Sequence, residues 1–282
     1  MASTTAAAEP YQGPLLTLEL VQQMRGAAEQ GTTSLRRSLD LGRSESAIEV
    51  DRAGWTNQGQ RYPYPERCRE RTVYYWSGSA FEPAARYSGS LIKLVPTEWG
   101  APTFEIDGIK MLPTARVSPY EDARSKVALI EPRGKVILDC CGGLGYFAAW
   151  CLESGARQVL SFEKNAEVLW LRRLNPWSPA LDARLTLTQA DIATHIRTLE
   201  SGLAEAILHD PPRFGIAGEL YSQEFYGELA RVLRRRGKLF HYTGSPNKLT
   251  SGRNVPREVA GRLTRAGFRT ELRADGVLAI LN

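Results

Sequence analysis

The sequence predicts an α/β fold. We expect a doubly wound, mostly parallel sheet with a C-terminal antiparallel hairpin, preceded by a smaller β-rich domain. Three observations predict it. From residue 118 onward, apolar runs with strand spacing alternate with runs of helical spacing, which is typical of a doubly wound sheet. Asp275 and Gly276 separate the last two apolar runs, and an Asp-Gly pair in that setting indicates a hairpin. Short β-favouring runs, separated by Gly, Pro, Asn and Asp, fill residues 35–111.

The first 117 residues divide into a flexible tail over residues 1–14 and a domain over residues 15–117. Helical spacing predicts a helix over Leu15–Ala28, which Gly31 ends. The β-favouring runs after it are Ser46–Val50, Thr72–Trp76, Ser90–Val95 and Thr103–Met111. We expect this domain to cover the functional site and to select the substrate.

Residues 118–282 form the second expected domain. Ser118 as N-cap and Pro119 at the first helical position predict a helix that runs to about Ile130. The strands expected after it are Val136–Asp139, Gln158–Phe162, Leu185–Thr188, Ala204–His209, Lys238–Tyr242, Arg269–Arg273 and Val277–Leu281. The helices expected between them are Tyr146–Ser154, Ala166–Leu174, Ile192–Leu199, Ser222–Leu233 and Pro256–Ala266. We place the arginines at 234–236 at the end of the fourth of these helices, which Gly237 closes.

Composition narrows the class of protein. Hydrophobic residues make up 43% of the chain, enough for a sizeable core. The net charge of +5 permits a nucleic acid partner without requiring one. The four cysteines include no Cys-x-x-Cys pair, which argues against a zinc site and for reduced thiols in the cytoplasm. We expect no metal, no signal peptide and no membrane partner, because the first residues are small and polar and no apolar run has spanning length.

A glycine-rich loop is expected directly after the strand Val136–Asp139. Glycines occupy positions 142, 143 and 145, and an apolar helical pattern begins at Tyr146. Glycines let the backbone approach a ligand closely, and the helix start offers free N–H groups. The sequence therefore predicts a nucleotide-type cofactor site. The pattern also satisfies the dinucleotide fingerprint, but the negative charge of Asp139 before the glycines is unfavourable for a pyrophosphate and suits a cationic ligand.

Acidic residues follow the next strands as well. Glu163 ends the second strand, Asp191 follows the third, and Asp210 follows the fourth and precedes two prolines. In this order, residues from about 118 to 282 resemble class I S-adenosylmethionine-dependent methyltransferases. Further stretches resemble the predicted archaeal-type methyltransferases that carry a DPPR motif, and these are Ser38–Gly42, Ala101–Met111, Leu174–Ser178, His209–Phe214, Gly218–Tyr221 and Phe240–Tyr242.

The resemblance implies that S-adenosyl-L-methionine is the cofactor. Gly143 and Gly145 would let the backbone pass under its methionine part, and Asp139 would attract its ammonium group. Family members usually have three glycines in this loop, and here Cys141 occupies the first of these positions. Cysteine is small and is buried readily, so we expect binding to survive the difference.

The resemblance also implies how the nucleoside is held. Glu163 would accept hydrogen bonds from both ribose hydroxyls. Asp191 would accept from the adenine amino group, with Ile192 against the ring. A loop cap is an alternative role for Asp191 taken alone.

Methyl transfer mainly requires alignment of the nucleophile, the methyl group and the sulfur. The resemblance implies that Asp210, Pro211 and Pro212 supply rigid acceptors for the N–H groups of an amine. Relatives carry an aromatic residue after the prolines, whereas this chain has Arg213. An arginine there can clamp a carboxylate or phosphate, or it can pair with Glu219 or another carboxylate of the protein.

Five side chains are candidates for substrate contact because they lie on loops or strand ends near the expected site. These are Arg213, Glu219, Tyr221, His241 and Tyr242. His209, within the fourth strand, is interpreted as a core residue whose hydrogen bonds are satisfied.

The function we expect is N-methylation of an amine-bearing substrate, with a small molecule favoured over RNA or protein, and a homo-oligomer is left open. The alternatives are an aminopropyltransferase of the polyamine synthase type, an NAD-dependent dehydrogenase, and a binding protein without activity. The Asp-Pro-Pro sequence argues for methyl transfer over the first alternative, and the acidic set argues against the second.

Overall fold

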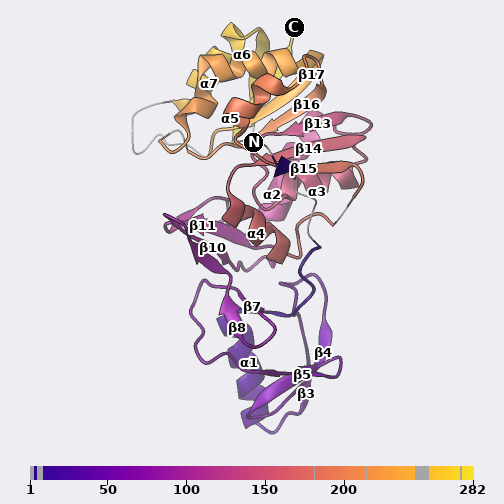
Figure 1. Ribbon diagram of the computed structural model, residues 1–282, viewed down its shortest axis with the longest axis vertical. Helices are drawn as coiled ribbons and strands as arrows, with labels where there is room; N and C mark the ends of the chain where they lie inside the picture. The colour runs from indigo at the N-terminus through magenta and orange to yellow at the C-terminus, as the bar shows by residue number, and fades with distance from the viewer. Residues whose placement is uncertain (1–2, 5–8, 181, 214, 245–253, 274) are drawn as a thin grey trace. The chain divides into compact units, whose positions relative to one another are not determined.

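A computed structural model describes residues 3–4, 9–180, 182–213, 215–244, 254–273 and 275–282 (Figure 1). The chain divides into two compact units. The C-terminal unit comprises Met1–Ala8, Ala123–Leu169 and Pro179–Asn282, and the N-terminal unit comprises Glu9–Asp122 and Trp170–Ser178. The division therefore falls inside a helix that begins at Pro119, and a short segment near residue 174 belongs to the N-terminal unit.

The C-terminal unit is organised by an eight-stranded sheet of order β1-β15-β14-β13-β16-β17-β19-β18 (Figure 1). Its strands are β1 (Ser3–Thr4), β13 (Val136–Asp139), β14 (Gln158–Glu163), β15 (Leu185–Gln189), β16 (Ala204–His209), β17 (Leu233–Tyr242), β18 (Phe268–Arg273) and β19 (Gly276–Leu281). Strands β13 to β17 are mutually parallel, while β19 pairs antiparallel with both β17 and β18. The predicted fold class and its terminal hairpin are confirmed. The hairpin connection is at residues 274 and 275, of which 274 lies outside the described residues.

Helices of this unit follow the strands in the expected alternation. They are α2 (Pro119–Ile130), α3 (Tyr146–Glu153), α4 (Ala166–Leu174), α5 (Ile192–His195), α6 (Gln223–Val232) and α7 (Val255–Arg265), with 3₁₀ turns η1 (Ile196–Thr198) and η2 (Gly218–Tyr221). Helices α2 and α4 contribute residues to both units. The cap of α2 is as expected, since the Ser118 hydroxyl accepts from the Tyr120 amide at 3.2 Å. The predicted helix over Ile192–Leu199 is a single α turn continued by the 3₁₀ turn η1.

The start of β17 corrects one prediction. The strand begins at Leu233, directly after α6, so the arginines at 234–236 belong to the strand and do not end the helix. Leu233 is already extended, with φ −85° and ψ 138°. The pairing of β16 with β17 shifts between Ala204 and Ala206. Gly237 allows this irregularity, because a Cβ there would lie 2.7 Å from the carbonyl oxygen of Arg234. Gly237 therefore permits a bulge and does not close a helix.

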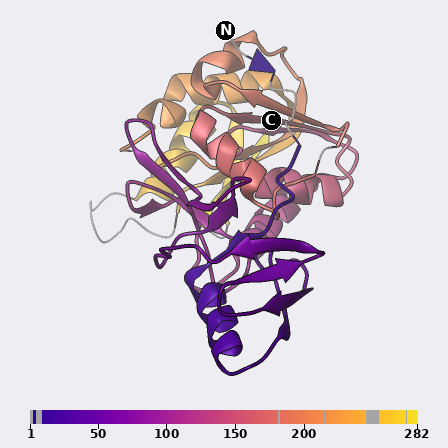
Figure 2. The ribbon, with the colours of Figure 1, turned by 60° about the horizontal axis from the view of Figure 1, so that its bottom comes forward.

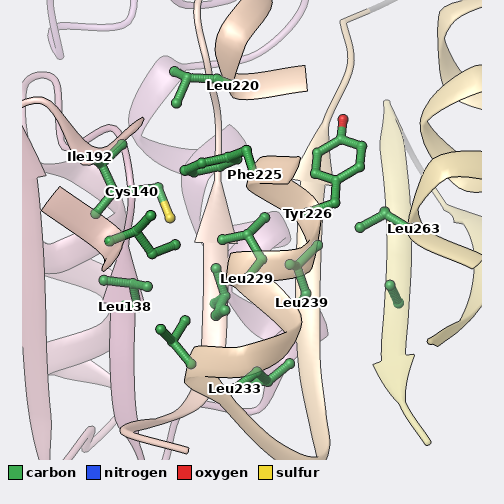
Figure 3. Packing of buried hydrophobic residues seen from close by; sticks show 14 of the residues in the cluster. Leu138, Cys140, Ile192, Leu220, Phe225, Tyr226, Leu229, Leu233, Leu239 and Leu263 are labelled. Carbon is green, nitrogen blue, oxygen red and sulfur yellow. The ribbon is translucent and has the colours of Figure 1, made fainter. Parts of the chain in front are cut away.

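The core of the C-terminal unit is an apolar cluster between the sheet and its helices. On α6, Phe225, Tyr226 and Leu229 are buried at helical spacing. They join strand residues such as Leu138 and Leu239, as Figure 3 shows. Burying a side chain of this size contributes about 1.5–3 kcal/mol, so the face of α6 fixes the end of β16 that precedes the expected site.

Besides its parts of α2 and α4, the N-terminal unit contains three small antiparallel sheets and a complete helix, α1 (Leu18–Glu29), which lies beside the strands in Figure 2. The sheets have the orders β12-β11-β10-β9, β2-β7-β8 and β3-β4-β5-β6. Their strands are β2 (Leu15–Leu16), β3 (Ser34–Arg37), β4 (Ser46–Val50), β5 (Gly54–Asn57), β6 (Gln60–Pro63), β7 (Tyr74–Trp76), β8 (Phe81–Pro83), β9 (Ala85–Tyr87), β10 (Leu91–Val95), β11 (Thr103–Ile106) and β12 (Ile109–Lys110). The helix starts later than predicted, because Thr17 caps it by accepting from the Leu20 amide at 3.3 Å.

The described residues of the expected tail are held by hydrogen bonds. The Tyr11 hydroxyl accepts from the Trp76 amide at 2.7 Å, and the Tyr11 amide donates to the Arg173 carbonyl at 2.9 Å. Burial raises the pKa of Tyr11 to about 12. Residues 9–14 therefore pack within the N-terminal unit, while residues 1–2 and 5–8 lie outside the described part of the chain. Among the described residues, no helix has the length and apolar character needed to cross a membrane.

Candidate active site

The glycine loop connects β13 to α3. Asp139 ends β13, is buried, and accepts from the Ser161 hydroxyl at 2.8 Å. The Gly142 amide donates to the Phe162 carbonyl at 2.7 Å, which ties the loop to the end of β14. Gly143 and Gly145 have φ of 48° and 86°. These are left-handed conformations in which a side chain is strained, so the loop turns sharply at the carboxyl edge of the sheet.

Glu163 at the end of β14 fastens this loop. Its Oε2 atom accepts from the Gly143 amide at 3.0 Å, and its Oε1 atom accepts from the Asn165 amide at 2.9 Å. The residue expected to hold a ribose thus also fixes the backbone of the glycine loop.

Asp191 begins α5 as its N-cap and accepts from the Ala193 amide at 2.9 Å. The helix-cap role is therefore real, and it leaves the second carboxylate oxygen of Asp191 3.8 Å from the Lys164 ammonium. The same ammonium lies 3.7 Å from an oxygen of Glu219 on η2. Ile192 is buried next to Asp191. Lys164 therefore lies near both the end of β15 and the turn η2.

Cys141, in the glycine loop, is close enough to several acidic groups for their charges to act on it. Burial raises the pKa of its thiol well above the usual value, and the nearby Cys140, Glu163, Asp210 and Asp139 raise it further. These three carboxylates come from the ends of β14, β16 and β13. The structure therefore gathers, around one small side chain, acidic residues that are far apart in sequence.

The Asp-Pro-Pro motif, residues 210–212, follows β16 and lies against η2. The Tyr221 hydroxyl donates to the Pro212 carbonyl at 3.0 Å. Tyr221 is only 4% exposed. Its pKa is raised mainly by burial and additionally by the charge of Asp210, so its hydroxyl is protonated and lies near that carboxylate.

Two buried histidines lie beneath this motif. The His209 ring N–H at Nε2 donates to the Leu220 carbonyl at 3.0 Å, and the ring is buried as expected of a core residue. The expectation that its hydrogen bonds are satisfied is wrong, because the buried Nδ1 has no hydrogen-bond partner among the described residues. His241 donates from Nδ1 to the Tyr242 carbonyl at 2.8 Å, so its Nε2 accepts from the Tyr226 hydroxyl at 2.9 Å. Burial lowers the pKa of His209 to about 4 and that of His241 well below its usual value. Both rings are therefore neutral.

The remaining candidates for substrate contact differ in exposure. Arg213 is exposed, and its carbonyl accepts from the Ile216 amide at 2.7 Å. The cationic neighbour shown for Glu219 is Lys164. His241 is fully buried, and both of its ring nitrogens form hydrogen bonds within the protein. Contact of His241 with a substrate stays a prediction. Phe214, within the quoted DPPR stretch, lies outside the described residues.

Sequence reasoning missed Lys126 on α2. Its ammonium lies 3.7 Å from the centre of the Tyr242 ring, and the residue is only 2% exposed. Such a contact is a cation–π interaction. The signal was present, because Lys126 lies three residues after Ala123 and four before Ile130, both on the buried face of α2. Within the described ranges, no group of three or more His, Cys, Asp or Glu residues is placed to hold a metal ion.

The fold of this chain is similar to that of solved structures. The structure is similar to spermidine synthase in complex with the transition state analogue AdoDATO, with a TM-score of 0.56 and 18% identity over 70% of this chain and 71% of that one. It is also similar to spermidine synthase from Thermotoga maritima, with a TM-score of 0.53 and 17% identity over 79% of this chain and 83% of that one. The chain has the class I S-adenosylmethionine-dependent methyltransferase-like fold, which aminopropyltransferases share.

Sequence comparison then gives the family. The chain is 38% identical over 214 residues to the uncharacterized protein MJ1233 of Methanocaldococcus jannaschii, across 75% of this chain and 73% of that protein. The chain belongs to the same family as MJ1233. It is also 31% identical over 134 residues to polyamine aminopropyltransferase 2 of Streptomyces coelicolor, a match that covers 44% of this chain and 24% of that protein. No family model matches the chain.

Proposed function

We propose that this protein is an S-adenosylmethionine-dependent N-methyltransferase that acts on an amine-bearing small molecule. The observation that carries the proposal is that the charges of Asp139, Glu163 and Asp210, at the ends of three neighbouring parallel strands, all act on Cys141 in a left-handed glycine loop. Such an acidic surrounding suits a cationic nucleoside and an amine, and it is unfavourable for a pyrophosphate.

The residues at the loop fit the methionine part of this cofactor. When bound, S-adenosylmethionine supplies a methyl group on a sulfonium sulfur. Asp139 attracts the ammonium group, directly or through water. Gly143 and Gly145 let the backbone pass close to the ligand, because their conformations favour residues without a Cβ.

The residues after β14 and β15 fit the nucleoside. Glu163 accepts from the ribose hydroxyls, in addition to its bonds from the Gly143 and Asn165 amides. Asp191 accepts from the adenine amino group through the oxygen that does not cap α5, and Ile192 packs against the ring.

The Asp-Pro-Pro motif aligns the amine. The Asp210 carboxylate and a proline carbonyl each accept an N–H bond, so that the nitrogen lone pair points at the methyl carbon. The Pro212 carbonyl also accepts from the Tyr221 hydroxyl, and since a carbonyl has two lone pairs, either proline carbonyl can take this acceptor role. Proline fixes φ at both positions after Asp210 and holds the acceptors still.

Further substrate contacts are assigned by exposure. Arg213 and Glu219 are exposed and Tyr242 is half-buried, so these three side chains can reach a substrate directly. Tyr221 and His241 are buried, and in this proposal they act on the substrate through the groups that they hold.

A second candidate is aminopropyl transfer from decarboxylated S-adenosylmethionine. Two observations favour it. The structure is similar to two spermidine synthases over most of the chain, and part of the sequence matches a polyamine aminopropyltransferase. The same carboxylates would serve, since Asp210 and Glu219 are suited to the amino groups of a polyamine.

One experiment separates the two functions. The purified protein is incubated with S-adenosylmethionine or its decarboxylated form, and with putrescine, spermidine or bulk tRNA as acceptor. Mass spectrometry then shows whether a methyl or an aminopropyl group has been added. We expect methyl transfer to an amine. If bulk tRNA is the acceptor, its binding must weaken steeply with added salt.

The role of Asp210 is tested in the same assay. Asp210→Ala should slow transfer about a hundredfold or more, the usual scale for a positioned acid–base group, with little change in the affinity for S-adenosylhomocysteine. Glu224→Ala, at an exposed position of α6 that pairs with Arg197, is the control. Normal turnover by Asp210→Ala would exclude the alignment role. A folded protein that binds neither form of the cofactor would exclude both functions.

A further inference from the structure

The 3₁₀ turn η2 holds the Asp-Pro-Pro motif from both sides. His209, directly before the motif, donates from Nε2 to the Leu220 carbonyl at 3.0 Å. Pro212, at the end of the motif, accepts from the Tyr221 hydroxyl at 3.0 Å. Two neighbouring residues of η2 thus contact the two ends of the segment that contains Asp210.

Both contacts are made in the protein interior. His209 is fully buried and Tyr221 is 4% exposed. The centres of the Tyr221 and His241 rings are 5.3 Å apart. The backbone carbonyl of Tyr221 accepts from the Arg262 guanidinium on α7 at 3.3 Å. Hydrogen bonds shielded from water hold their geometry better than exposed ones. The position of η2 is therefore determined by the core and not by solvent.

Few torsions remain between the two anchors. Peptide planes are rigid, and both prolines have a fixed φ. Once His209 and the Pro212 carbonyl are held, the backbone between them can change mainly through φ and ψ of Asp210 and through ψ of the two prolines. A small displacement of η2 would therefore move the Asp210 carboxylate directly.

We propose that η2 is a clamp for the transfer site, in which Tyr221 and His209 are positioning residues that set the place of Asp210 and the prolines. The expected effect of the clamp on the transfer rate rests on the proposed transferase function. The expected effect of the clamp on the order of the backbone at residues 210–212 does not. The clamp gives Tyr221 a role through its hydroxyl, in addition to the packing that a phenylalanine would supply.

The test compares Tyr221→Phe with Tyr226→Phe. Each variant removes one buried tyrosine hydroxyl, but Tyr226 is bonded to His241 and not to the motif. The first readout is hydrogen exchange, without ligand, of the Ile216 and Ala217 amides, which donate to the Arg213 carbonyl directly after the motif. We expect exchange about tenfold faster in Tyr221→Phe than in Tyr226→Phe, the equivalent of one net hydrogen bond.

The second readout is transfer to the amine that the wild-type protein accepts, with spermidine as the first probe. Tyr221→Phe should lower kcat about tenfold and leave the affinity for S-adenosylhomocysteine within twofold, because the clamp acts on the amine side. His209→Phe removes the other anchor and should accelerate exchange of the same amides.

The outcomes are distinct. If exchange and kcat are the same in Tyr221→Phe and Tyr226→Phe, the clamp is excluded. If His209→Phe also leaves the exchange unchanged, neither anchor restrains the motif. A wild-type protein that transfers nothing would overturn the proposed function, and the exchange comparison would still decide whether the clamp exists.

Discussion

Replacing Glu163 by glutamine tests the reasoning about the glycine loop most directly. The carboxylate accepts from two backbone amides, those of Gly143 and Asn165, through different oxygens. Glutamine has the same shape, but one of its two terminal atoms is an NH₂ donor. Either orientation therefore places a donor against an N–H group. The variant loses one of the two bonds, and the charge that strengthens the other.

The size of the effect follows from the type of bond. A hydrogen bond to a charged group contributes about 1.5–3 kcal/mol, and because Glu163 is half-buried we take the lower end of this range. If loop order is required for binding, this corresponds to a loss of about tenfold in affinity. Lost acceptance from a ribose would add to this loss, so tenfold is the smallest change that we expect.

Isothermal titration with S-adenosylhomocysteine measures the affinity, and hydrogen exchange of the Gly143 amide without ligand reports the loop itself. Glu224→Gln is the matched control, because its exposed carboxylate pairs with Arg197 on the surface, and such pairs contribute little. A folded Glu163→Gln protein with wild-type affinity and unchanged exchange at Gly143 would refute the reasoning.

Two further predictions concern stability. The unfolded chain protonates a histidine below about pH 6.5, whereas folded His209 stays neutral down to about pH 4, so acid favours unfolding. His209 alone should lower the stability by about 3 kcal/mol as the pH drops through this window, and His241, whose pKa burial also lowers, should add to this loss. Urea titration measures the loss, and a flat profile would contradict the burial of neutral rings. Gly276→Ala places a Cβ 2.3 Å from the His241 carbonyl oxygen, so calorimetry should show a loss of about 1–3 kcal/mol. At Gly261 inside α7, an added Cβ meets only the end of the Arg265 side chain at 3.9 Å, so Gly261→Ala should instead stabilise the folded protein by up to about 1 kcal/mol. Equal effects of the two alanine substitutions would contradict the close packing of Gly276 against β17.

The elements with unambiguous signals in the sequence were predicted with their ends. Strands β13 and β16 and helix α4 have the expected bounds. The two strands are mostly apolar and are buried at every position except Glu205. Helix α4 ends before an Asn-Pro pair. The beginning of β17 was mispredicted because three arginines conceal the change from helix to strand, and Gly237 resembles a helix stop when only the sequence is known.

The placement of the acidic residues was predictable for a topological reason. Carboxyl ends of parallel strands meet at one edge of a sheet, so residues such as Glu163 and Asp210 had to lie near each other. The hydrogen bonds among them were not predictable. The bond of Tyr221 to Pro212 and the contact of Lys126 with Tyr242 join segments whose approach is set by helix packing, and nothing in the local sequence marks these pairs.

The short segment Trp170–Ser178 interrupts the C-terminal unit in sequence but belongs to the N-terminal unit. Within that unit, Trp170 lies 3.8 Å from the Arg86 guanidinium, and the Trp177 indole donates to the Leu41 carbonyl at 3.0 Å. A gene fragment cut between residues 117 and 118 would lack both tryptophans. A fragment that ends at residue 117 would therefore lose packing partners of Arg86 and Leu41, and an N-terminal unit with these contacts intact has to include Trp170–Ser178.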